Sequence, residues 1–132
     1  MKTATDFIKA ATDKNAELLD ENTALRAPTQ AKEYSKKIFM AIKDKSLSSE
    51  DLDKLAKDLK GYKVVTAYPP NTSNTIEVEV MKRVKTESYT RLIVVRHEKA
   101  GWKVQDIKKP YVIYMQNFGN QMGGGRGGRR GR

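Results

Sequence analysis

Two different spacings of apolar residues divide the chain into a helical first half and a β-rich second half. Up to about residue 60, apolar residues recur every three or four positions, the spacing of a helix with one buried face. From Val64 onward they largely alternate with polar residues, as in a strand with one buried face. Helices followed by successive strands predict an α+β fold, in which the helices pack on one face of an antiparallel sheet.

Three N-terminal helices are predicted within about residues 5–60. The first ends near Glu21, and the second follows Pro28, a residue that suits the first turn of a helix. The third has the clearest bounds, because Ser48 and Asp51 form a capping-box variant at its start. Gly61 suits the left-handed conformation just past its end.

A curved antiparallel sheet of four to five strands is predicted within about residues 62–115. The expected strands are residues 64–68, 75–84, 88–98, 102–107 and 111–115. Tight turns are expected at Lys85-Thr86-Glu87 and Lys99-Ala100-Gly101. Because Leu92-Ile93-Val94-Val95 is apolar without alternation, the strand that holds it is predicted to be central in the sheet.

The aromatic and apolar segment 111–118 has two interpretations. It can be the last strand of the domain, or an arm that adds to the sheet edge or fills the groove of a neighbouring molecule. In the second case it would make the protein a component of an assembly. The candidate interface residues are Tyr111, Ile113, Tyr114 and Phe118.

The stretch from Tyr89 to Ile107 resembles the closing hairpin of NTF2-like (cystatin-like) domains. In those domains a long strand leads through a charged turn and Gly-Trp into W-K-V-x-D-I, which stands here as Trp102–Ile107. The resemblance covers about residues 1–109 and implies helices first, then a curved four-stranded sheet. NTF2-like domains include isomerases, dehydratases and protein-binding modules, so the resemblance implies a fold and no particular function.

The last eleven residues hold six of the nine glycines of the chain and four arginines. They cannot bury enough apolar surface to offset the loss of backbone entropy, so residues 119–132 are predicted to be a disordered tail after a single domain of residues 1–118. Guanidinium groups match phosphates and stack on bases, and the tail resembles the RGG type that follows single strands with little sequence preference. Its arginines are Arg126, Arg129, Arg130 and Arg132.

The positive charge extends beyond the tail. The net charge is +10, and the four tail arginines leave +6 on the rest of the chain. A second group of cations is expected on neighbouring strands and turns, interleaved with Tyr89 and Tyr111 as in basic grooves with stacking aromatics. Its members are Lys82, Arg83, Lys85, Arg91, Arg96, Lys99, Lys103, Lys108 and Lys109. The alternative interpretation is a plain solvated face.

The composition argues against several kinds of chemistry. Without cysteine there are no disulfides, thiolate metal sites or cysteine nucleophiles, and one histidine cannot form a zinc-binding cluster, so no metal or cofactor is expected. That residue, His97, is expected at an exposed strand end without a partner to orient its ring. The N-terminus lacks an apolar signal region, and no run approaches a membrane span. We expect a cytoplasmic protein, or one inside a virion or ribonucleoprotein particle.

These observations lead us to expect a non-enzymatic protein that binds single-stranded RNA or DNA without sequence specificity. It would act in a ribonucleoprotein or virion assembly, as a homo-oligomer or within a larger complex. The alternative is a structural or protein-interaction module, dimeric or docked into a larger complex, whose basic tail binds an acidic partner. A third class, a small-molecule enzyme, would need a polar pocket inside the curved sheet that holds His97 against a carboxylate.

Overall fold

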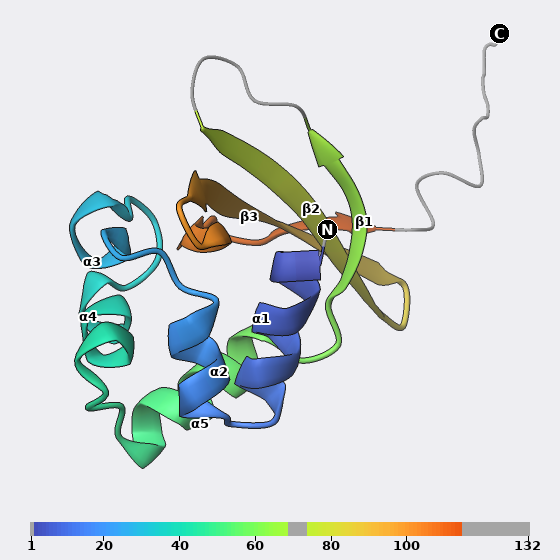
Figure 1. Ribbon diagram of the computed structural model, residues 1–132. Coiled ribbons are helices and arrows are strands. Elements are labelled where there is room, and N and C mark those ends of the chain that lie inside the picture. The colour runs from blue at the N-terminus through green and yellow to red at the C-terminus, as the bar shows by residue number, and fades with distance from the viewer. Residues whose placement is uncertain (1, 69–73, 115–132) are drawn as a thin grey trace, which may run out of the picture.

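Helices come first along the chain and the strands of one antiparallel sheet follow, as the apolar spacing predicts (Figure 1). The computed structural model describes residues 2–68 and 74–114. The helices in this part are α1 (Lys2–Thr12), α2 (Ala16–Glu21), α3 (Ala27–Gln30), α4 (Lys36–Asp44) and α5 (Ser49–Leu59). The strands are β1 (Lys63–Tyr68), β2 (Thr75–Val84), β3 (Glu87–Glu98), β4 (Gly101–Ile107) and β5 (Tyr111–Tyr114). The predicted α+β class is confirmed.

The sheet has the order β1-β2-β3-β4, and β5 pairs with β3 as well. One stretch of β3 pairs with β4 and an earlier stretch, Glu87–Thr90, pairs with β5, so β3 is the central strand, as its apolar run predicts. Irregular registers in β1–β2 and β3–β4 bend the sheet. This is the arrangement that the NTF2-like resemblance implies: the helices come first, and a curved sheet with the β3–β4 hairpin follows.

The first predicted helix is interrupted in its middle. α1 ends at Thr12, and Lys14 has a left-handed backbone with φ of 56°. The Asn15 side chain then accepts a hydrogen bond from the backbone N–H of Leu18 and starts α2. An N-cap of this kind begins a new helix rather than continuing the old one, so two helices stand where the apolar stripe predicted one.

Asp106 explains why the second predicted helix is also interrupted. This β4 carboxylate is only 5% exposed. Its oxygens accept hydrogen bonds from the backbone N–H groups of Lys32 at 2.9 Å, Glu33 at 3.1 Å and Tyr34 at 3.0 Å. A buried carboxylate is stable only when it is well hydrogen-bonded, and these three donors satisfy it. The donors belong to the connection between α3 and α4, which is therefore held against the sheet instead of forming a helix.

The core lies between the helices and the sheet (Figure 1). Its large, fully buried side chains are Phe7, Leu19, Phe39, Ile42, Leu55, Leu59, Val78, Val80, Ile93, Val95, Val104 and Ile107. The longest described helices, α1 and α5, have 11 residues each. Among the described residues, no helix has the length and apolarity needed to cross a bilayer.

The capping box of α5 gives a first testable prediction. The Ser48 hydroxyl accepts a hydrogen bond from the Asp51 backbone N–H at 3.1 Å, as the sequence predicts. Ser48→Ala should therefore lower the free energy of unfolding by about 1 kcal/mol, measured by urea denaturation. Ser49→Ala, an exposed neighbour inside the helix, is the matched control and should change it by less than about 0.5 kcal/mol. Equal losses in the two variants would contradict the role of the cap.

Candidate nucleic-acid interface

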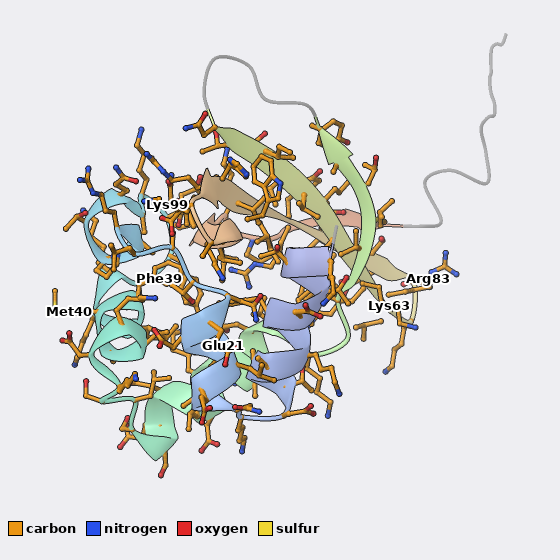
Figure 2. All side chains as sticks on the ribbon, viewed as in Figure 1. Glu21, Phe39, Met40, Lys63, Arg83 and Lys99 are labelled. Carbon is orange, nitrogen blue, oxygen red and sulfur yellow. The ribbon has the colours of Figure 1, made fainter. Side chains whose placement is uncertain are left out.

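Cations gather where α5 leads into β1 and where β2 turns into β3. We call this group the basic end; it consists of Lys60, Lys63, Lys82, Arg83 and Lys85. The β1–β2 register brings the two parts together, because Lys63 is paired with Met81, the neighbour of Lys82. Figure 2 shows Lys63 and Arg83 near one another, on the side of the molecule away from Lys99.

Two left-handed residues shape the basic end. Gly61 has a φ of 85° and carries the chain from α5 into β1, as the sequence predicts. Lys85 has a φ of 57° in the tight turn between β2 and β3. Lys82 lies over the Tyr62 ring and Lys63 is paired with Met81, so the connection that follows α5 lies beside the end of β2.

Lys82 is held by two aromatic rings. Its ammonium nitrogen lies 4.9 Å from the centre of the Tyr62 ring and 5.5 Å from the centre of the Tyr89 ring. A cation over a ring face is attracted by the ring quadrupole. Burial raises the pKa of Tyr62, although the positive charge of Arg91 opposes this shift. The Tyr62 ring therefore stays a neutral phenol and leaves the charge of Lys82 uncompensated.

The other four cations of the basic end are exposed, and none forms an ion pair with a carboxylate among the described residues. The lysines that do form ion pairs are Lys2, Lys9, Lys14, Lys43, Lys54 and Lys108. The carboxylate of Glu87 lies at the same end of the sheet and accepts a hydrogen bond from the Tyr89 hydroxyl at 2.7 Å. The basic end thus keeps most of its positive charge available to a partner.

The chain continues toward its tail from this same end of the sheet. β5 ends at Tyr114, which is paired with Glu87 at the start of β3. Twelve peptide units separate Tyr114 from Arg126, the first tail arginine. Arg126, Arg129, Arg130 and Arg132 themselves lie outside the described residues.

Arg91 does not belong to the exposed basic surface expected for it. It is 7% exposed, and its guanidinium donates hydrogen bonds to the backbone carbonyls of Lys108 at 3.0 Å and Asp58 at 3.2 Å. In the register it is paired with Val80, whose side chain is buried in the core. Arg91 therefore links β3 to α5 and to the end of β4, and its charge is directed into the protein.

The remaining predicted cations are spread over other parts of the sheet. Arg96 and Lys103 are paired with each other, at the opposite end of β3 from Arg83. Lys108 forms an ion pair with Glu77 at 2.6 Å, and this contact raises the pKa of Lys108. Of the nine cations expected on neighbouring strands and turns, the structure places Lys82, Arg83 and Lys85 at the basic end. It adds Lys60 and Lys63, which the sequence reasoning missed.

The segment that begins at Tyr111 forms β5 within the sheet of its own chain, so its first four residues are a last strand. Tyr111 is 52% exposed. Ile113 and Tyr114 are strand positions opposite Ser88 and Glu87. Phe118 lies outside the described residues.

His97 lies exposed at the end of β3, as expected. Its ring centre is 5.0 Å from that of Trp102, so the imidazole packs on an indole rather than on a carboxylate. In the part of the chain that the structure describes, no group of three His, Asp or Glu residues could hold a metal ion. The arrangement that the enzyme alternative requires, His97 held against a carboxylate inside the sheet, is not the one found at this residue.

No protein-family model matches the chain, and none of the curated proteins does. In fold, the chain is similar to the crystal structure of a candidate dehydratase of the NTF2-like family from Streptomyces avermitilis. The TM-score is 0.47 with 13% sequence identity, over 80% of this chain and 88% of that chain.

Proposed function

We propose that this protein binds single-stranded nucleic acid without sequence specificity, through the basic end together with the Gly/Arg tail. The observation that carries the proposal is the basic end itself. Its exposed cations have no acidic partner among the described residues, and the chain leaves the sheet beside them on its way to four arginines. A ribonucleoprotein or a nucleic-acid-filled particle would be the setting.

The proposed mechanism is electrostatic. Each Lys or Arg that neutralises a phosphate releases a condensed counterion, and this release drives binding. Neighbouring strands lie about 4.8 Å apart, so the cations of β1, β2 and their turn cover only a few consecutive phosphates. The tail is tethered to the same place, so its contacts follow at a high effective concentration once the basic end has bound. Neither the basic end nor the tail would bind nucleic acid tightly by itself.

Neutralising the basic end tests the proposal. Lys63→Gln/Arg83→Gln/Lys85→Gln removes three expected phosphate contacts, so the log–log slope of affinity against salt should become shallower by about 2. At about 0.1 M salt the affinity for a short single-stranded RNA should fall by about 10²-fold, measured by fluorescence anisotropy. The matched control is Lys32→Gln/Lys36→Gln/Lys37→Gln, which removes the same charge from exposed lysines near α4. Equal losses in the two variants, or no loss in the first, would refute the proposed interface.

A competitor separates nucleic acid from an acidic protein partner. Polyglutamate carries carboxylates but no bases, so arginine cannot stack on it as it does on RNA. It should displace labelled RNA only at a charge concentration about tenfold or more above that of unlabelled RNA. Displacement at equal charge concentration would favour the alternative function, in which the cations dock an acidic protein.

A further inference from the structure

A second group of cations lies at the opposite end of β3 from the basic end. A groove of about 450 Å³ opens there between the α2–α3 connection and the β3–β4 hairpin. Its lining residues are Leu25, Arg26, Arg96, His97, Glu98, Lys99 and Ala100. Figure 2 shows Lys99 on this side of the molecule. The proposed function does not use this groove.

The groove carries an excess of positive charge. Three cations line it against one carboxylate, Glu98, which accepts a hydrogen bond from the Leu25 backbone N–H at 3.3 Å. The Arg96 guanidinium donates to the side-chain oxygen of Gln30 at 3.2 Å, a neutral partner that orients it without cancelling its charge. Arg26 and Lys99 are exposed, and neither forms an ion pair among the described residues.

An aromatic pair stands beside these cations. His97 lines the groove, and its ring packs against that of Trp102. The backbone N–H of His97 also donates to the Asn74 carbonyl at 2.8 Å, and this hydrogen bond holds the end of β3 in place beside the groove. Cations beside a flat ring are the usual parts of a site that tracks a nucleic-acid backbone and stacks a base.

The two cationic sites are too far apart to act as one. Arg83 is paired with Ser88 near one end of β3, and Glu98 ends the same strand. A strand rises about 3.3 Å per residue, so about 30 Å separates the basic end from the groove. A short nucleic-acid strand that lies across the basic end therefore leaves the groove free for a second nucleic-acid strand.

We infer that the groove is a second phosphate site, for the sugar–phosphate backbone of single-stranded nucleic acid, and that one molecule can hold two strands at once. This inference rests on the proposed function. Arg26 and Lys99 are exposed side chains that can adjust to the position of a phosphate. The Arg96 guanidinium is held in one orientation by its hydrogen bond to Gln30. A protein with two such sites bridges strands and would condense nucleic acid instead of only coating it.

A bridging assay with the full chain tests the inference. A short oligouridine is fixed to beads, the protein is added, and capture of a second, labelled oligouridine is measured at about 0.1 M salt. The variant Arg26→Gln/Lys99→Gln should retain binding to one strand within about twofold, because the basic end and the tail are intact. Its capture of the second strand should fall by about tenfold, as expected when two phosphate contacts are lost.

The control Lys36→Gln/Lys37→Gln removes the same charge outside the groove and should capture the second strand as well as the unmodified protein does. Capture retained by the groove variant would overturn the inference, since bridging would then come from association of two protein molecules. Equal loss in the control would overturn it too. If the unmodified chain binds one strand but captures no second, only the second site fails; if it binds none, the proposed function fails.

Discussion

Truncation after Met122 should lower the affinity for single-stranded RNA by on the order of 10²- to 10³-fold at about 0.1 M salt. The deleted residues carry four arginines, and each phosphate contact on a single strand contributes about 0.7 to the salt slope. The slope should therefore become shallower by about 3. Fluorescence anisotropy with one short RNA across a salt series measures both quantities.

A charge-preserving variant shows which property of the tail matters. With lysine at positions 126, 129, 130 and 132, the tail keeps its charge but loses the planar group that stacks on bases and binds phosphate with two donors. The salt slope should then equal that of the unmodified chain, while the affinity falls by about tenfold. A truncated chain that binds as tightly as the full chain would exclude the tail from the interface.

Asp106→Asn should be the most destabilising of the substitutions considered for this protein. The amide that replaces one carboxylate oxygen brings a donor toward backbone N–H groups of Lys32, Glu33 and Tyr34, so at least one buried donor is left unsatisfied. Loss of charge also weakens the remaining hydrogen bonds. We expect the free energy of unfolding to fall by about 2–4 kcal/mol.

Urea denaturation followed by circular dichroism measures this loss. Asp44→Asn is the matched control, because Asp44 is exposed at the end of α4 and forms no ion pair among the described residues. It should change stability by less than about 0.5 kcal/mol. A loss below about 1 kcal/mol in Asp106→Asn would show that the connection between α3 and α4 does not depend on this carboxylate.

The strands could be predicted from the sequence because alternation is a local property. The expected strand 75–84 coincides with β2, and the other predicted ends within the described residues agree with the structure within one residue, whereas the end predicted at Met115 lies outside them. Polar residues follow the alternating or apolar runs of β2 and β3, at Lys85 and Lys99. The apolar run of β3 also predicted its central position, because only a strand covered on both faces tolerates such a run.

The helix breaks could not be predicted in the same way. The connection between α3 and α4 is set by Asp106, more than 70 residues away in the sequence. A contact of that separation leaves no periodic signal in either segment. The break after α1 does have a local signal, because Asn15 is a good N-cap residue, but the apolar spacing up to Leu19 predicts one helix there.

The candidate site was predicted in part, for a related reason. Lys82, Arg83 and Lys85 are close in the sequence and stay close in the structure. Lys63 lies near these three residues only because of the β1–β2 register. Arg91 lies apart from them because its position in β3 faces the helices. Beside a continuous apolar run, the sequence does not say which face of the sheet a neighbouring polar residue occupies. Register, which depends on the partner strand, decides it.

The salt dependence of RNA binding by the full chain tests the central claim most directly. Lys63, Arg83 and Lys85 of the basic end and the four tail arginines give about seven phosphate contacts, so the log–log slope should be about −5 on single-stranded RNA of any sequence. A slope of that size would mean that the body and the tail bind the same strand together. Binding with a slope no steeper than about −1, or no binding at all, would contradict the proposed nucleic-acid interface.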